Sequence, residues 1–168
     1  AFRALTQSGR VFTADSLKGT THVANFFFTT CPGVCKDLSK KMAELHTKLQ
    51  NHKANDIRLV SFSVDPSTDT VPLLKAYAER YGARWVFLTG DEKEMLRTII
   101  DGYLQPAYKS PDGVEKVTHS NMFVLVDKDL RIRGFYRAVA GDMGPDELKR
   151  LVEEIDVLRC EYRTAKKP

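Results

Sequence analysis

The 168-residue sequence predicts an α/β fold in which a central, mostly parallel sheet carries helices on both faces. Two patterns lead to this prediction. Apolar runs of strand length alternate with segments in which apolar residues recur every three or four positions, as on one face of a helix. No repeat, low-complexity run or linker interrupts this alternation. We therefore expect residues 1–168 to form one domain.

The first third of the chain predicts a short arm, a strand and a helix. Residues 10–13 follow a Ser-Gly turn signal, which predicts an N-terminal hairpin arm. Residues 21–28 are an almost continuous apolar run, as in a strand that is covered on both faces. A helix is predicted from about residue 34 to residue 50. Its apolar face is Leu38, Met42, Leu45 and Leu49.

Two further strand–helix pairs follow along the chain. Residues 57–64 and 85–88 are the predicted strands. Each precedes a predicted helix, the first at residues 71–81 and the second from a capping Asp91 to about residue 103. Strands that are connected through helices run parallel in one sheet.

The last third predicts an antiparallel hairpin and a final helix. Residues 122–127 and 131–136 have strand patterns and are joined by a short Lys-Asp connection, after a Pro-Asp-Gly turn signal at residues 111–113. The final helix is predicted to open at Pro145. Its apolar face is Leu148, Leu151, Val152, Ile155 and Leu158.

Composition excludes several classes of protein. The chain is 42% hydrophobic and 29% charged, as in ordinary globular domains, and its net charge of +4 is spread over the sequence. No block of Lys and Arg indicates a nucleic-acid partner. No run of about 18 apolar residues predicts a membrane span. The chain begins almost directly on structured-looking sequence, so we expect an upstream anchor or leader to be missing from it.

The three cysteines are divided into a close pair and a distant single residue. Cys31 and Cys35 flank a Pro-Gly-Val segment directly after the predicted buried strand, whereas Cys160 lies on the last predicted helix. This arrangement is too sparse for a disulfide framework. A cysteine pair at the first strand-to-helix turn is typical of a thioredoxin-like layout, and sites in such sheets lie at the carboxyl ends of strands.

The spacing of the pair suits both metal binding and redox chemistry. Two helical residues four positions apart project from one face, so we expect the two sulfurs to lie together. Thiolate is favoured near a helix N-terminus, and soft sulfur pairs suit Cu(I) or zinc. A disulfide is also possible at this spacing. The alternative is a purely structural pair.

One of the four histidines is a candidate ligand. His119 lies in a predicted loop directly before the strand at residue 122, and a thioredoxin-like layout places that loop beside the cysteine turn. Thioredoxin-type reductases usually carry a cis-proline there, and this chain has none. Imidazole is a common metal ligand. We expect His22, His46 and His52 to be solvated or packing residues.

Together these residues resemble the SCO/SenC family. The resemblance rests on residues 26–35 (FFFTTCPGVC), 63–70 (SVDPSTDT) and 88–90 (LTG), together with the loop of His119. It covers nearly the whole chain and implies a thioredoxin-like fold. It also implies that Cys31, Cys35 and His119 bind copper, mainly Cu(I), while the histidine could help to retain Cu(II).

The family resemblance also implies partners and a location. Copper would be delivered to the dinuclear centre of a cytochrome c oxidase subunit, and another copper chaperone or a thiol reductant would serve the site. The location would be the periplasmic face of a bacterial inner membrane or the mitochondrial intermembrane space. Contact with the membrane would be made only through a segment absent from this chain, and a monomer is expected.

Three positions depart from the family pattern. Gly33 stands where the family usually has an acidic residue, Lys36 where it has proline, and Thr118 where an Asp often precedes the histidine. The site is therefore less negative than usual. Lys36 adds positive charge beside Cys35, which favours thiolate and redox work.

Other polar and sulfur-containing residues are predicted to have structural roles. We interpret Asp65 and Asp69 as strand-ending and helix-capping residues. Met122 and Trp85 are predicted to lie in the core, and Cys160 is predicted to be an incidental thiol.

Two alternatives to a copper chaperone remain open. In a thiol–disulfide oxidoreductase, Cys31 would attack a partner disulfide and Cys35 would resolve the mixed disulfide. A thiol peroxidase shares the fold, but the Thr expected three residues before its nucleophile is replaced by Phe28 before Cys31.

Overall fold

The computed structural model describes most of the chain. The described residues are 2–31, 35–108, 118–138 and 147–164, and for Cys35, Thr118 and His119 the description covers the backbone only. The predicted turn at residues 111–113 and the predicted helix start at Pro145 fall outside these ranges, as do Gly33 and the other two residues between the paired cysteines.

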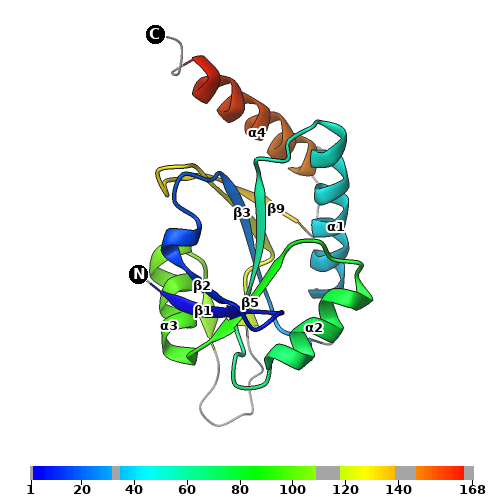
Figure 1. Ribbon diagram of the computed structural model, residues 1–168, viewed down its shortest axis with the longest axis vertical. Coiled ribbons are helices and arrows are strands. Elements are labelled where there is room, and N and C mark those ends of the chain that lie inside the picture. Colours follow the sequence, from blue (N-terminus) through cyan, green and yellow to red (C-terminus); the bar gives the residue numbers. More distant parts are fainter. Residues whose placement is uncertain (1, 32–34, 109–117, 139–146, 165–168) are drawn as a thin grey trace.

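Seven strands form one mixed sheet in the order β2-β1-β5-β4-β3-β8-β9 (Figure 1). Strands β3, β4 and β5 run parallel to one another, and the remaining neighbours pair antiparallel. The N-terminal arm and the C-terminal hairpin therefore form the two edges, as the sequence predicts. The strands are β1 (Arg3–Thr6), β2 (Val11–Thr13), β3 (His22–Phe27), β4 (Arg58–Ser63), β5 (Val86–Gly90), β8 (Met122–Val126) and β9 (Ile132–Arg137).

Helices cover both faces of this sheet. In Figure 1, α3 lies on one side of the strands, and α1 and α2 lie on the other. Helix α4 packs against α1 and β9. The helices are η1 (Ala14–Ser16), α1 (Cys35–Asn51), α2 (Val71–Arg80), α3 (Glu92–Arg97), η2 (Thr98–Gly102) and α4 (Glu147–Thr164).

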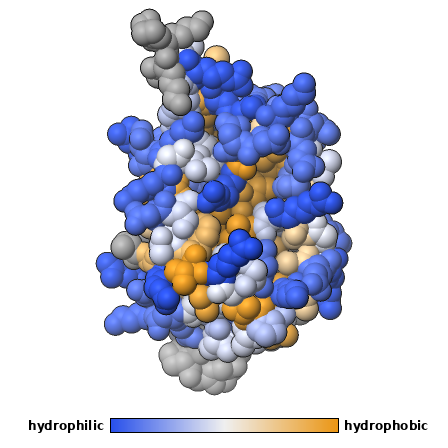
Figure 2. All heavy atoms as spheres, in the orientation of Figure 1, coloured by the Kyte–Doolittle hydropathy of each residue, from blue (hydrophilic) through white to orange (hydrophobic). Residues whose placement is uncertain are grey.

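The core forms where the apolar faces meet. All six residues of β3 are buried, as expected for a central strand with helices on both sides. The predicted apolar face of α1 is fully covered, with exposed fractions of 0–4%. Figure 2 shows the surface of the molecule in the orientation of Figure 1. Hydrophilic residues cover its flanks, and apolar residues gather along the middle of the view, where Figure 1 draws the strands.

The structure differs from the prediction after β5. The Asp91 side chain accepts a hydrogen bond from the amide of Glu94 (2.9 Å), which confirms the predicted cap. The helix that follows is divided, however, because α3 ends at Arg97 and a π-helical turn, η2, continues to Gly102. A two-stranded sheet of β6 (Ala107–Tyr108) and β7 (Thr118–His119) then follows. The predicted loop at His119 is therefore wrong, since two-residue strands leave no pattern in the sequence.

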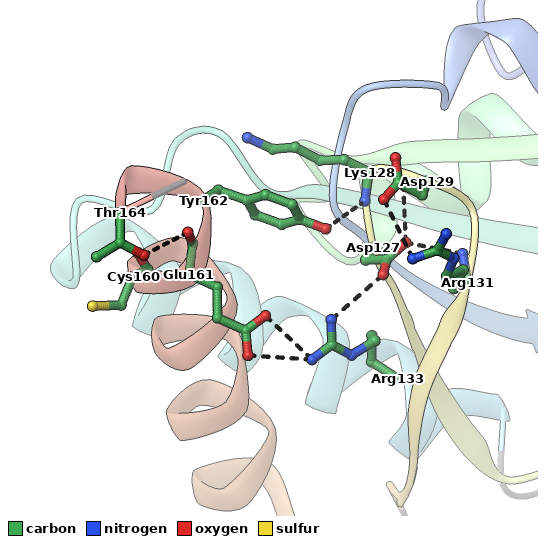
Figure 3. Close-up of polar contacts among 9 residues, drawn as sticks. All are labelled: Asp127, Lys128, Asp129, Arg131, Arg133, Cys160, Glu161, Tyr162 and Thr164. Carbon is green, nitrogen blue, oxygen red and sulfur yellow. Dashed lines mark hydrogen bonds and ion pairs between the residues drawn. The ribbon is translucent and has the colours of Figure 1, made fainter. Parts of the chain in front are cut away.

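The C-terminal hairpin and α4 are joined by a polar network (Figure 3). Arg133 on β9 lies between the carboxylates of Asp127 and Glu161, at 3.5 and 3.3 Å. Asp127 also accepts the backbone N–H groups of Asp129 and Arg131, both at 2.9 Å, which closes the turn between β8 and β9. One buried carboxylate therefore fixes this turn and connects it to α4.

Candidate metal centre

Cys31 lies four residues beyond the end of the buried strand β3. Its backbone N–H donates to the carbonyl oxygen of Phe28 (3.3 Å), which closes a short turn. The side chain is 9% exposed and carries a free thiol. The carboxyl ends of β3, β4 and β5 lie at the same edge of the sheet because these strands are parallel. Cys31 therefore follows the sheet edge at which α/β proteins place their sites.

Cys35 is the first residue of α1 as described. Its backbone lies at the positive end of the helix dipole, which favours a thiolate. Cys31, by contrast, has no helical conformation. The expectation that both sulfurs project from one face of a helix is thus wrong, because the first cysteine belongs to the turn before the helix. The neighbouring Lys36 is exposed and adds positive charge there.

The topology brings His119 to the same edge of the sheet. Strand β8 starts three residues after His119 and pairs antiparallel with β3, with His22 opposite Val126 and Ala24 opposite Val124. The beginning of β8 therefore lies beside the end of β3. Since His119 precedes β8 and Cys31 follows β3, the two backbones reach the same end of the sheet from opposite directions. Strand β6 supports this position, because Ala107 pairs with His119.

A buried carboxylate lies behind the turn of Cys31. One oxygen of Asp69 accepts two hydrogen bonds from Thr29, from the backbone N–H at 3.0 Å and from the hydroxyl at 2.5 Å. The other oxygen accepts the hydroxyl of Ser63, the last residue of β4, at 2.6 Å. Burial raises the pKa of the Asp69 carboxyl, and the hydrogen bonds from Ser63 and Thr29 act against that rise.

This arrangement differs from the prediction. Asp69 was predicted to cap a helix, but the N-cap of α2 is Thr70, and the Asp69 side chain turns to Thr29 and Ser63 instead. The sequence gives no signal that Thr29 and Ser63 bind this carboxylate, since hydroxyl residues are common at strand ends. Asp65 does end β4 as predicted, and its carbonyl oxygen accepts the amides of Thr68 and Asp69.

The three other histidines and Trp85 take the expected structural roles, whereas Met122 does not. His22 is buried and its Nε2 lies 3.0 Å from the hydroxyl of Tyr103, so it is a packing histidine. His46 lies beside Trp85, which is a core residue at 5% exposure. His52 is exposed and pairs with Asp156 on α4. Met122 is only half-buried, so the prediction that it lies in the core is wrong, and Cys160 is exposed.

Among the side chains that the structure describes, no three histidine, cysteine or acidic groups converge on one point. Two of the three predicted ligands, Cys35 and His119, are described by their backbone alone. Nor does any helix within the described ranges combine the length and apolar character that a bilayer crossing requires.

The chain belongs to the SCO1/SenC family. The family model matches residues 1–154, which include the strand before Cys31, the turn around Asp65 and Asp69, and the segment of His119. The resemblance inferred from the sequence is confirmed.

Solved structures of this family share the fold, which is thioredoxin-like. A SCO1/SenC family lipoprotein from Bacillus anthracis is 28% identical with a TM-score of 0.83, over 94% of this chain and 92% of the other. ScoI from Arabidopsis thaliana, solved with copper bound, is 26% identical with a TM-score of 0.76, over 93% and 96%. BsSco, described as a cytochrome c oxidase assembly protein with a disulfide switch, is 30% identical with a TM-score of 0.77, over 92% and 89%.

Proposed function

We propose that this chain binds copper through Cys31, Cys35 and His119 and delivers it to a subunit of cytochrome c oxidase. One observation carries the proposal. The chain places the backbones of all three residues at one end of the sheet, in a family in which copper-bound structures are known. Copper is the cargo of such a protein, so it is held for transfer and not used for catalysis.

The three donors fit the chemistry of Cu(I). Thiolate sulfur is a soft ligand that selects Cu(I), and imidazole suits copper in either oxidation state. Three ligands leave the metal open to a fourth donor. A cysteine of the receiving protein could therefore enter before the cysteines of this chain leave. The low exposure of Cys31 limits competing reactions of its sulfur with small oxidants.

The proposed setting is an oxidising compartment that faces a membrane, either the bacterial periplasm or the mitochondrial intermembrane space. The support comes from a relative described as a lipoprotein and from another described as an oxidase assembly protein. We propose that residues 1–168 act there as one domain and as a monomer. A second copper chaperone or a thiol reductant would supply the metal or keep the cysteines reduced.

The first test is the affinity of the fully reduced protein for Cu(I), measured by competition with a colorimetric Cu(I) chelator. We expect one tightly bound copper per chain. The His119→Ala variant should bind Cu(I) at least about tenfold more weakly, because it loses one of the three proposed ligands. A tenfold change in affinity corresponds to about 1.4 kcal/mol. His52→Ala is the matched control, since that histidine is exposed and pairs with Asp156 on α4.

Either of two results would contradict the proposal. Wild-type protein without tight copper would remove the chaperone function. Equal affinities of the His119→Ala and His52→Ala proteins would leave copper binding in place and remove His119 from the ligand set.

A thiol–disulfide oxidoreductase is the second candidate, and the disulfide switch described for BsSco favours it. The thiolate of Cys31 would attack a partner disulfide, forming a mixed disulfide and releasing one partner thiolate. The thiolate of Cys35 would then attack the sulfur of Cys31 and release the second partner thiolate. Two electrons pass to the partner, and this chain is left with a Cys31–Cys35 disulfide. Stoichiometric reduction of an oxidised oxidase subunit by copper-free protein would favour this function.

A further inference from the structure

The Asp69 carboxylate links the turn of Cys31 to the body of the sheet. Asp69 is completely buried, and three donors point at its two oxygens. Two of these donors belong to Thr29, which lies two residues before Cys31. The third belongs to Ser63, which pairs with Phe27 at the last rung between β4 and β3. The carboxylate therefore joins the chain just beyond β3 to the end of β4.

The position of Asp69 in the sequence makes this contact unexpected. An Asp next to a helix start usually accepts the free N–H groups of its own helix. Here the N-cap of α2 is the following residue, Thr70, which makes no side-chain cap. The Asp69 backbone N–H instead donates to the carbonyl oxygen of Asp65 (2.9 Å), and the side chain faces Thr29. A buried charge is costly unless hydrogen bonds compensate it, and here they come mainly from the segment before Cys31.

Two adjacent contacts determine where Cys31 lies. The amide and hydroxyl of Thr29 are held by one oxygen of Asp69, which fixes both the backbone and the side chain of that residue. The amide of Cys31 is held by the carbonyl oxygen of Phe28. Only Thr30, which is exposed, separates these two anchored residues. Without the carboxylate, the segment after β3 loses its connection to β4 at Thr29.

We propose that Asp69 is a positioning residue that holds Cys31 in place for copper binding through its two hydrogen bonds to Thr29. This inference rests on the proposed function for the role of copper, but the positioning of Cys31 can be measured without any metal. Asp69 acts through Thr29 and is not proposed as a ligand.

The first measurement is the rate of Cys31 alkylation by iodoacetamide at pH 7. The background is the full chain with Cys35→Ser and Cys160→Ser, which leaves Cys31 as the single thiol. We expect Asp69→Ala to raise the rate about tenfold, because the buried sulfur reacts when the turn opens and the lost hydrogen bonds make opening easier. Asp69→Asn should restore most of the slow rate, since an amide oxygen can still accept both donors of Thr29.

Asp127→Ala is the matched control for a general loss of stability. Asp127 is also a buried carboxylate that accepts two hydrogen bonds from its neighbouring turn, as Figure 3 shows, but it lies at the opposite end of β8. Its loss should destabilise the protein and leave Cys31 alkylation unchanged. Equal alkylation rates in the Asp69→Ala and Asp127→Ala proteins would overturn the inference.

A second pair of variants tests the role of Asp69 if Asp69→Ala does not fold. Thr29→Val and Ser63→Ala each remove one hydroxyl from the same carboxylate. Thr29→Val should accelerate alkylation severalfold, whereas Ser63→Ala should have the smaller effect because it acts on the β4 side. The opposite order would overturn the inference.

The last measurement repeats the Cu(I) competition in proteins that retain all three cysteines. We expect Asp69→Ala to bind copper about tenfold more weakly than Asp127→Ala. Without the Asp69 carboxylate, the turn of Cys31 must be ordered when copper binds, and this cost lowers the affinity. Wild-type protein without tight copper would remove the proposed function and leave the alkylation comparison valid. Tight wild-type copper together with equal alkylation and equal copper affinity in both variants would remove only the role of Asp69.

Discussion

His22 begins β3 and is buried among the strands. Its Nε2 lies 3.0 Å from the hydroxyl of Tyr103, and its Nδ1 faces the carbonyl oxygen of Thr20 at 3.5 Å. Burial is the main cause that lowers the pKa of His22 to about 4. The ring is therefore neutral in the folded protein at neutral pH.

The depressed pKa of His22 makes stability dependent on pH. The unfolded chain takes up a proton near pH 6.5, whereas the folded chain does so only near pH 4. The neutral ring of His22 contributes to the free energy of unfolding. This contribution is complete above the unfolded pKa and is lost as the pH falls from about 6.5 to about 4. We expect it to reach about 3 kcal/mol. Urea unfolding should be measured at pH 7 and at pH 5. The free energy of unfolding should fall less between these two pH values for His22→Gln than for wild type.

His52→Gln provides the control for that measurement, because His52 is exposed and pairs with Asp156 at the surface. The His52→Gln protein should still lose stability between pH 7 and pH 5, because it retains the buried His22. If the His22→Gln protein lost as much stability as wild type between pH 7 and pH 5, the buried ring would not be the titrating group.

Single residues also show which contacts the sequence could predict. The core position of Trp85 was predicted, and His22 was predicted to be a solvated or packing residue, of which the structure shows the packing role. The contact of Asp69 with Thr29 was not predicted, although both residues lie in segments that carry the family resemblance. A carboxylate before a helix has a local explanation as a cap, and sequence pattern carries no signal for a partner on another strand.

Among the elements, α4 shows how apolar packing and ion pairs differ. Its inner face is buried, and Ile155 and Leu151 are completely covered. Its outer connection is the pair of Arg133 with Glu161, in which the Glu161 side chain is 49% exposed. Solvent screens such a pair, so the apolar face is expected to hold the helix in place.

We therefore expect Ile155→Ala to lower the free energy of unfolding by about 3 kcal/mol, because it removes buried methyl groups and leaves a cavity. Glu161→Gln should cost less than about 1 kcal/mol. Chemical denaturation of both variants at the same ionic strength would measure the difference. A larger loss for Glu161→Gln would mean that the network in Figure 3, and not the apolar face, anchors α4.

The long helices were predictable, whereas the two-residue strands and the π-helical turn were not. The apolar faces of α1 and α4 each repeat over several turns, so their type and their buried residues were correct. Strands β6 and β7 have two residues each and no alternation to detect. The π-helical turn after α3 was also missed, since its sequence continues the apolar spacing of an ordinary helix.

In the whole molecule, Trp85 lies where several parts of the fold meet. It is the single tryptophan of the chain. Its indole N–H donates to the hydroxyl of Ser61 on β4 (2.9 Å), which in turn donates to Asn25 on β3 (2.6 Å). The indole ring also lies beside Phe87 and beside His46 of α1. Its fluorescence should therefore report on the three central strands and on α1.

We expect the chain to unfold in a single transition, as one domain does. Trp85 fluorescence follows the central sheet, and far-UV circular dichroism follows all helices, including α4. The two signals should give the same midpoint in urea. Separate midpoints would show that the C-terminal hairpin and α4 unfold independently of the central strands.

The fold class was predictable from the order of the elements, but the site was predictable only in part. The position of Cys31 follows from the buried strand before it. The approach of His119 depends on β8 pairing antiparallel beside β3, which is a long-range property. The prediction that both cysteines lie on one face of a helix was wrong, because Cys31 lies in a turn. Spacing alone does not show where a helix begins.

The antiparallel neighbour of β3 has a consequence for the order in which the protein matures. Both cysteines precede His119 in the chain, and the segment of His119 comes to their end of the sheet when β8 pairs with β3. Contacts between distant parts of a chain form late. A chain in which β8 has not yet paired therefore presents two thiols without the imidazole. Under the proposed function, metal captured at that stage would be held by sulfur alone, and pairing of β8 with β3 would add His119 as the proposed third ligand.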